Sequence, residues 1–202
     1  MGFSLTVEKY DAEPGETLVR LPEGATSVAP SAFADCDDVE RIEMGPDVFL
    51  VGDRAFEGCM RLQEVGFSPE LRYLGKNAFR NCLALSEVVL PRMLEFVEEQ
   101  AFFGCTKLES VLFEGPVESI GAMAFQRCIS LREVRLPEGL VRIGERAFAS
   151  CTSLEVVEVP ASVRIVEKQA FAACRNLREI RFLGEPEALA DDAFASCPNL
   201  GL

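Results

Sequence analysis

The stretch that decides the fold reads Ile120-Gly121-x-x-Ala124-Phe125-x-x-Cys128-x-x-Leu131-x-x-Val134-x-Leu136-Pro137-x-x-Leu140. From Val28 onward this pattern returns every 23 residues without an insertion or a deletion. Its phenylalanine and cysteine mark the period most clearly, at Phe33, Phe56, Phe79, Phe102, Phe125, Phe148, Phe171 and Phe194, and at Cys36, Cys59, Cys82, Cys105, Cys128, Cys151, Cys174 and Cys197. A unit this short cannot bury its own apolar face, so neighbouring units must stack and share one core. The sequence therefore predicts a solenoid of eight repeats.

Each repeat contains two segments with the character of a strand. The first ends in alternation of strand-forming residues, with Val134 and Leu136 facing inward. Pro137 ends this strand, because proline donates no ladder hydrogen bond. The segment from Leu140 to Ile143 then returns across the core as a second short strand, after which Gly144 permits a tight turn.

The rest of each repeat has helical spacing. Ala147, Phe148 and Cys151 predict one or two helical turns on the far side of the coil, and helix-ending residues precede the cysteines at Gly58, Asn81 and Gly104. Packed helices need ~8–10 Å between their axes, whereas strands need only ~4.8 Å. We therefore predict an α/β repeat solenoid with a parallel sheet on the concave side and short helices on the convex side.

Both ends of the array depart from the repeat. We predict one domain over residues 1–202, in which 1–27 form an N-terminal cap with a partial repeat and 28–202 form the eight repeats, the last one truncated. Phe3, Leu5 and Val7 alternate with polar residues, which predicts a strand in the cap. An open C-terminal end would expose core and sheet edge, so we also predict a homodimer through that end.

The composition excludes several kinds of partner. The formal net charge is −13, whereas nucleic-acid binding needs a basic stripe and an anionic membrane surface repels an acidic chain. No apolar run approaches the ~18 residues of a membrane span, so we predict no membrane insertion. No signal peptide is visible, which predicts a cytoplasmic location for the chain as written and a surface or secreted location if an export signal has been removed.

Nothing in the sequence points to catalysis, a cofactor or a metal. Histidine is absent, so no Ser-His-Asp or Cys-His pair can form. The cysteines are spaced one per repeat with no C-x-x-C pair, which predicts buried structural thiols, and Cys197 in the last coil is expected to react most readily. The carboxylate pairs, at Asp37-Asp38, Glu98-Glu99 and Asp191-Asp192, are expected to face solvent. We predict that the chain is not an enzyme.

The repeat resembles the BspA-type leucine-rich repeat, also called the Treponema pallidum type. The unit Ile-Gly-x-x-Ala-Phe-x-x-Cys-x-x-Leu-x-x-Val-x-Leu-Pro-x-x-Leu carries the resemblance over residues 28–202, and the opening from Val7 to Pro22 is similar to that family's usual start. The resemblance implies a right-handed leucine-rich repeat solenoid. It also implies a binding role, in bacterial surface proteins that attach to host matrix proteins or to other cells.

Function is expected at variable positions that point outward. One column lies between the inward strand positions and contains Arg20, Glu43, Gly66, Val89, Leu112, Arg135, Glu158 and Arg181. A second column precedes the inward residue of the crossing segment and contains Ser27, Leu50, Tyr73, Phe96, Ser119, Arg142 and Ile165, with Phe49 beside it. Exposed apolar patches usually mark interfaces. The partner-binding candidates are Leu50, Tyr73, Phe96, Val89, Leu112, Arg135 and Arg181.

These columns predict a rigid scaffold that binds an unidentified protein through its concave sheet and an adjoining apolar and aromatic stripe. Such a stripe is also consistent with self-association or with packing beneath a neighbouring loop. A second function stays open, that of a bacterial cell-surface adhesin or glycan- and matrix-binding module whose export signal has been removed.

Overall fold

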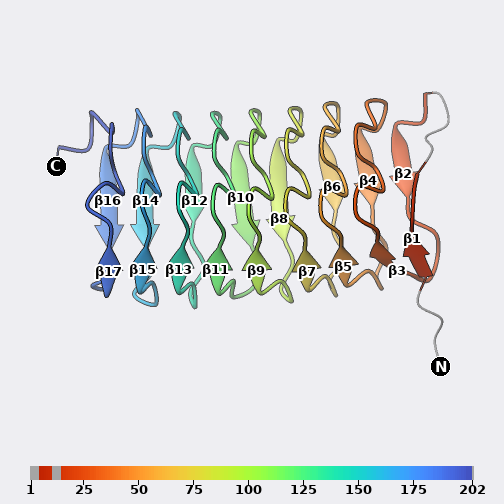
Figure 1. The fold of residues 1–202 in the computed structure, drawn as a ribbon, viewed down its shortest axis with the longest axis horizontal. Coiled ribbons are helices and arrows are strands. Elements are labelled where there is room, and N and C mark those ends of the chain that lie inside the picture. Colours follow the sequence, from red (N-terminus) through yellow and green to blue (C-terminus); the bar gives the residue numbers. More distant parts are fainter. Residues whose placement is uncertain (1–4, 11–14, 202) are drawn as a thin grey trace.

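The chain winds into a stack of parallel coils (Figure 1). The computed structural model describes residues 5–10 and 15–201 and contains no cis peptide bond among them. Each coil contributes one strand to either side of the solenoid, and all strand pairs are parallel. The 23-residue repeat thus becomes one turn of a β-solenoid, as its period predicts.

The crossing segments form the longer of the two sides. They make a nine-stranded sheet whose strands are β1 (Leu5–Val7), β3 (Ala25–Val28), β5 (Leu50–Val51), β7 (Tyr73–Leu74), β9 (Phe96–Val97), β11 (Ser119–Ile120), β13 (Arg142–Ile143), β15 (Ile165–Val166) and β17 (Ala188–Leu189). The prediction of a second short strand in every repeat is confirmed.

The strands around the Val-x-Leu pattern form the other side. A three-stranded sheet contains β2 (Leu18–Arg20), β4 (Arg41–Glu43) and β6 (Glu64–Gly66), and a five-stranded sheet contains β8 (Glu87–Leu90), β10 (Ser110–Phe113), β12 (Glu133–Arg135), β14 (Val156–Val159) and β16 (Glu179–Phe182). This side is therefore divided between β6 and β8, while the nine-stranded sheet runs past the same coils unbroken.

The predicted short helices are wrong, because the described residues contain no helix. The segment around each Phe and Cys is a series of turns instead. Two positions in it adopt left-handed backbone angles coil after coil, as at Met123 (φ 56°) and Arg127 (φ 65°). Gly58, Asn81 and Gly104 occupy the second of these positions, with φ of 77°, 59° and 74°. A right-handed helix cannot pass through residues in this conformation.

Backbone hydrogen bonds between coils replace the helical ones. The amide of Met123 donates to the carbonyl of Glu145 (2.8 Å), and Phe125 donates to Ala147 (2.8 Å), both one coil further on. The intervening amide of Gln126 donates back to the carbonyl of Met123 within the turn (3.1 Å). Successive amides thus donate alternately to carbonyls of the next coil and to carbonyls within the local turn. The hydrogen-bonding groups of the backbone are therefore paired without a helix.

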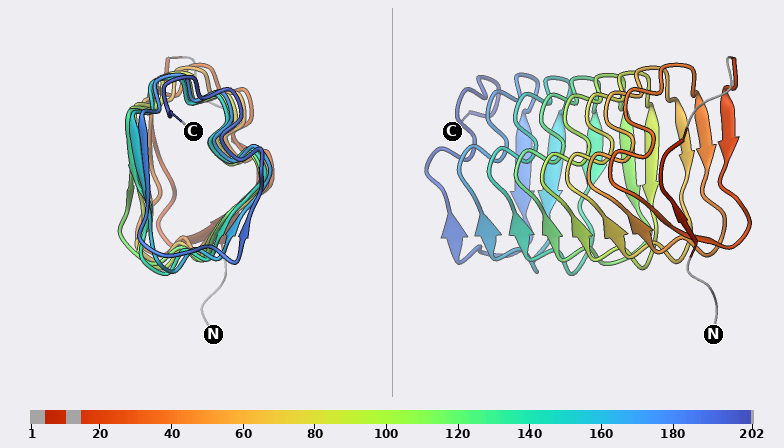
Figure 2. Two further views of the ribbon diagram at one scale, coloured as in Figure 1. Left: turned by 90° about the vertical axis from the view of Figure 1, so that its left-hand side faces the viewer. Right: turned by 45° about the vertical axis from the view of Figure 1, so that its right-hand side comes forward.

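This arrangement also corrects the predicted curvature. A difference in spacing between helices and strands was expected to bend the array, but both sides are joined coil to coil by backbone hydrogen bonds. The coils accordingly lie almost over one another when viewed along the solenoid (Figure 2). The array has no marked concave and convex sides to distinguish a binding face.

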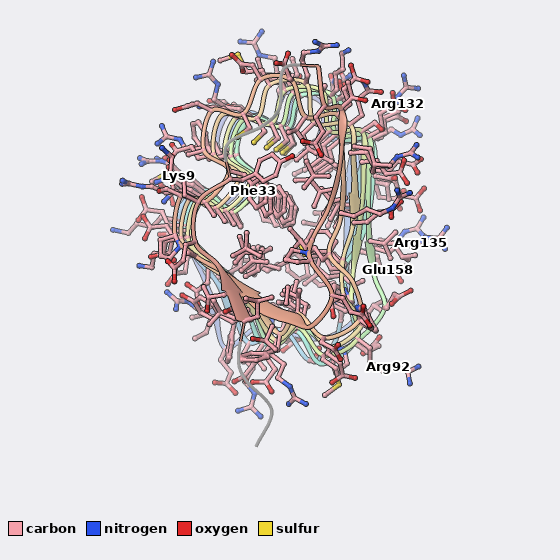
Figure 3. All side chains as sticks on the ribbon, turned by 90° about the vertical axis from the view of Figure 1, so that its right-hand side faces the viewer. Lys9, Phe33, Arg92, Arg132, Arg135 and Glu158 are labelled. Atoms are coloured by element: carbon pink, nitrogen blue, oxygen red, sulfur yellow. The ribbon has the colours of Figure 1, made fainter. Side chains whose placement is uncertain are left out.

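The core is a continuous column of apolar side chains with a ladder of stacked rings. Centroids of successive phenylalanines, from Phe33 to Phe194, lie 4.9–5.7 Å apart. Tyr10 extends the ladder at the N-terminal end, with its ring stacked 4.7 Å from that of Phe33. Figure 3 shows the ring of Phe33 inside the coil. Tyr10 stands 23 residues before Phe33, so the sequence period alone locates this first ring.

Glycine at the Gly144 position has a different role from the predicted one. Its φ lies outside the left-handed region, and a Cβ atom added there would lie 2.8 Å from the backbone nitrogen of Ala122 in the preceding coil. Gly75 shows the same close approach, at 2.5 Å from the nitrogen of Asp53. The residue is needed for close backbone packing between coils rather than for a turn.

The described part of the N-terminal segment pairs with the strands that follow it. β1 pairs with β3, and β2 pairs with β4. Phe3, the first member of the predicted alternation, lies outside the described residues. Among the residues that are described, no helical segment has the length and hydropathy needed to cross a bilayer.

The phenylalanine ladder gives a direct test of the packing. Phe125 is fully buried between Phe102 and Phe148, so Phe125→Ala should lower the free energy of unfolding by about 3–5 kcal/mol in urea denaturation. Phe96→Ala, which removes a ring from the outer surface, is the matched control and should cost about 1 kcal/mol or less. Equal losses for the two variants would contradict the assignment of core and surface.

Candidate functional site

The first candidate surface is a short apolar stripe on the nine-stranded sheet. Cα partners in the ladder join Leu50 to Tyr73 and Tyr73 to Phe96, so the three side chains lie on successive coils. Tyr73 and Phe96 are 38% and 37% exposed, and Phe49, beside Leu50, is 42% exposed. We call Phe49, Leu50, Tyr73 and Phe96 the stripe surface.

The stripe surface has clear ends. Ser27 pairs with Leu50 on one side, and Ser119 pairs with Phe96 on the other, so the apolar column occupies three coils. The next coil carries Arg142, whose guanidinium binds the carboxylate of Glu167 at 2.6 Å. The rings are held by strands whose inward neighbours, such as Leu74 and Val97, are buried in the core. The stripe is therefore presented on a fixed backbone.

Carboxylates border the stripe. Partial burial of the Tyr73 phenol is the largest cause of its raised pKa, and the negative charges of Asp53 and Glu98 raise the pKa further. Asp53 accepts a hydrogen bond from the amide of Lys76 (2.9 Å), which fixes the carboxylate between two coils. The phenol thus stays protonated at neutral pH and remains available as a hydrogen-bond donor.

The second candidate surface lies on the five-stranded sheet. Val89 and Leu112 are partners in the β8–β10 ladder and are 44% and 53% exposed. They lie beside the division between β6 and β8, at the edge of the five-stranded sheet. Their outward placement agrees with the alternation in the sequence.

Beyond this apolar pair the outer column becomes charged. Arg135 and Arg181 flank Glu158 in the ladder, yet each arginine binds the glutamate on its own strand, at 2.8 Å for Glu133 and 2.6 Å for Glu179. These exposed pairs contribute little stability, about 0–1 kcal/mol each. Figure 3 shows Arg135 and Glu158 projecting outward from the coil.

A groove of about 680 Å³ lies on the same face over β12 and β14 and is also lined by the residues on either side of β16. Its lining includes Arg135 but also residues that were not among our candidates, such as Arg132, Val156 and Leu183. Arg132, Glu155 and Arg178 of this lining share one position of the repeat, so the period places them in one column. The groove itself depends on how several columns meet on this face.

The two candidate surfaces face different sides of the solenoid. In Figure 2 the two sets of strands lie on different sides of the coil, and the turns after the longer strands connect them. Figure 3 likewise shows Arg135 and Lys9, which follows β1, on opposite sides. The expectation that the stripe adjoins the other sheet as one binding face is therefore wrong, and the two surfaces must be considered separately.

The cysteine ladder is structural in the way the spacing predicts. Cys59, Cys82, Cys105, Cys128, Cys151 and Cys174 are buried, and none of the eight cysteines forms a disulfide bond. From Cys59 onward each thiol donates to the carbonyl of the phenylalanine 26 residues earlier, at 3.0–3.3 Å. The cysteines thus link neighbouring coils through weak hydrogen bonds.

The described residues contain no group of three or more His, Cys, Asp or Glu side chains that could hold a metal ion. The carboxylates of Asp37, Asp38 and Asp191 are exposed, as expected, and the remaining members of the three acidic pairs are half-buried. The absence of catalysis and of a cofactor stays a prediction.

The geometry defines a class of protein, a leucine-rich repeat solenoid with variable outward columns on a fixed core. Comparison with known families is consistent with this class, because the profile of the BspA type leucine rich repeat region (6 copies) matches residues 17–128 and 73–201. The chain belongs to the BspA-type leucine-rich repeat family.

Solved structures give the same result. The leucine-rich repeat protein of Treponema pallidum is 28% identical with a TM-score of 0.68, and the match covers 96% of this chain and 82% of that one. A leucine-rich repeat protein from Bacteroides ovatus is 25% identical with a TM-score of 0.64, covering 91% of this chain, which spans only 59% of its length.

A leucine rich cell surface protein from Faecalibacterium prausnitzii shares the fold, with 24% identity and a TM-score of 0.50 over 91% of this chain and 71% of its own. No curated protein sequence matches the chain.

The thiols provide a pH-dependent test of the cysteine ladder. Burial raises the pKa of Cys105 and Cys151 to about 12, whereas interaction with the neighbouring Cys174 thiol lowers the pKa of Cys197 to about 7. Because the thiolate is the reactive form, iodoacetamide at pH 8 should label Cys197 well before the buried thiols in native protein.

The labelling rate of Cys197, followed by mass spectrometry, should fall as the pH drops through about 7. Cys197→Ser should remove this fast reaction, and unfolding in urea should make all eight cysteines reactive. Rapid native labelling of Cys105 or Cys151 would contradict the buried ladder.

Proposed function

We propose that this protein is a rigid scaffold that binds another protein through the stripe surface. The observation that carries the proposal is the column of half-buried Leu50 and exposed Tyr73 and Phe96, which three neighbouring strands hold in register. Outward strand positions in water are normally polar, and a run of apolar and aromatic side chains there is typical of an interface.

Membership of a repeat family supports the proposal without naming a partner. Solenoids commonly bind through extended surfaces built from variable positions, since their cores are fixed by the repeat. Here the inter-coil hydrogen bonds and the phenylalanine ladder fix the backbone beneath the stripe. A partner would order only side chains on binding, which keeps the entropic cost of association low.

The chemistry of the stripe suits recognition. Tyr73 and Phe96 offer ring faces and the Tyr73 hydroxyl offers a polar contact, and aromatic residues of this kind dominate binding energy in many interfaces. The Val89–Leu112 pair contains no aromatic side chain, and the guanidinium of Arg135 on the next coil is already paired with Glu133. We therefore assign the main contact to the stripe surface and not to the five-stranded sheet.

The alternative function, a cell-surface adhesin or a glycan- and matrix-binding module, would use the same solenoid with a different partner. It predicts binding of the purified chain to matrix proteins or glycans in array measurements. Stripe-dependent binding to a glycan in place of a protein would favour this alternative.

The proposal is tested by removing the stripe while the fold stays intact. Tyr73→Ser combined with Phe96→Ser should weaken binding of captured protein partners by at least about tenfold, because each ring acts as an anchor. Partners would be identified by affinity purification with the wild-type chain and then measured individually by titration.

Val89→Ser combined with Leu112→Ser is the matched control, since it removes two exposed apolar side chains from the other side of the solenoid. The control should keep wild-type affinity, and both variants should keep a wild-type midpoint in urea. Loss of binding in the control alone would place the interface on the five-stranded sheet.

A further inference from the structure

The charges around the stripe surface indicate which kind of partner segment would occupy it, an inference that rests on the proposed function. Three carboxylates border the stripe, those of Asp53, Glu95 and Glu98. Within the described part of the chain, none of the three lies within 4 Å of a basic group. The nearby cations already have partners, because Lys76 binds Glu99 at 3.3 Å and Arg72 lies 3.9 Å from Glu70.

Two of the three carboxylates act on the phenol of Tyr73, and the third directly precedes Phe96 in the chain. Glu95 and Glu98 flank Phe96 along its own strand, while Asp53 follows Leu50 by three residues and is fixed by the amide of Lys76. Besides partial burial, Asp53 and Glu98 both raise the pKa of the Tyr73 phenol, and the cation of Lys76 lowers it by less. The two carboxylates thus outweigh the one cation near the centre of the apolar stripe.

The opposite side of the solenoid carries many paired carboxylates, although Glu87 and Glu158 there make no ion pair among the described residues. Most of its acidic side chains are neutralised within or between strands, with ion pairs of 2.6–2.8 Å at Arg20–Glu43, Arg41–Glu64, Arg135–Glu133, Arg178–Glu155 and Arg181–Glu179. On the nine-stranded sheet, Arg142 pairs with Glu167 two coils beyond Phe96. Asp53, Glu95 and Glu98, which make no ion pair among the described residues, lie on coils that carry the exposed rings.

A second copy of the chain does not fit this surface. Each protomer has a formal charge of −13, and stacking two stripe surfaces would bring like carboxylates together around a partly desolvated centre. Like charges that face each other across an interface cost several kcal/mol and select against that pairing. Self-association through the stripe is therefore disfavoured by the groups that border it.

We propose that the stripe surface binds a basic segment of a partner protein, in which lysine or arginine residues flank a few apolar side chains. The apolar side chains would cover Leu50, Tyr73 and Phe96, and the cations would meet Asp53, Glu95 and Glu98. An arginine or lysine near the rings of Tyr73 and Phe96 would also gain cation–π attraction. Such a segment would bury the apolar side chains of the stripe and would form ion pairs with its carboxylates.

The test uses two synthetic peptides that differ only in charge. One alternates lysine with phenylalanine and leucine, and the other has glutamate in place of each lysine. Fluorescence anisotropy with the full chain should show binding of the basic peptide, at least about tenfold weaker binding of the acidic one, and marked weakening of the basic complex as salt is raised.

Amino-acid substitutions distinguish the contribution of the carboxylates to peptide binding from that of the rings. Asp53→Asn with Glu98→Gln should weaken the basic peptide by about tenfold at low salt, as expected for two exposed charge contacts. Glu87→Gln with Glu158→Gln is the matched control, because it makes the same change in net charge on the other side of the solenoid. The control should bind as the wild type does.

Each other outcome has a distinct meaning. Equal binding of both peptides, or equal weakening by the control, would overturn the basic partner while leaving a role for the stripe intact. Sedimentation that shows a wild-type dimer dissociated by Tyr73→Ser with Phe96→Ser would assign the stripe to a second copy and also overturn it. The proposed function itself fails only if the ring variant keeps every protein partner of the wild type.

Discussion

Backbone hydrogen bonding between successive coils is the constraint on which the whole structure depends. It operates on both strand sides and also through the turns, where amides such as those of Met123 and Phe125 donate to the next coil. A ladder of this kind fixes the rise of every coil near the ~4.8 Å spacing of adjacent strands. A helix in the same place would satisfy its own amides and demand more room, so helical turns and this spacing exclude each other.

The core follows from that spacing. Flat rings stack well at such separations, and the phenylalanines do so with interplanar angles of 3–26° along the ladder from Tyr10 to Phe194. Small residues are needed wherever backbone meets backbone, which is why a Cβ at Gly75 or Gly144 would collide with the preceding coil. The cysteines complete the arrangement, because a thiol is small enough to be buried and still donates to the phenylalanine carbonyl of the previous coil. Regularity in this chain is therefore explained by packing alone.

Recognition is left to the columns that packing does not constrain. On one side those columns carry arginine and glutamate in mutual pairs, so their charges are largely compensated within the molecule. On the other side three coils combine exposed rings with carboxylates that make no ion pair among the described residues. Such a surface is unfavourable in isolation, because its apolar side chains are exposed to water and its carboxylates make no ion pair in the described part of the chain. A partner with apolar and basic side chains would bury the first and pair with the second.

Much of this could be predicted from the sequence. The period of 23 residues and the buried identity of Phe125 and Cys128 follow from the recurrence of these residues in every repeat. Strand alternation places Val134 inward and the column of Leu50, Tyr73 and Phe96 outward. That each coil contains turns and not a short helix depends on the tertiary structure. Local spacing at Ala147 and Phe148 is compatible with a helix, and only hydrogen bonds to the next coil favour the left-handed residues that exclude it. The separation of the two candidate surfaces and the unpaired state of Asp53 and Glu98 were likewise decided by the closed shape of the coil, which sets the side that each column faces and the charges that meet across it.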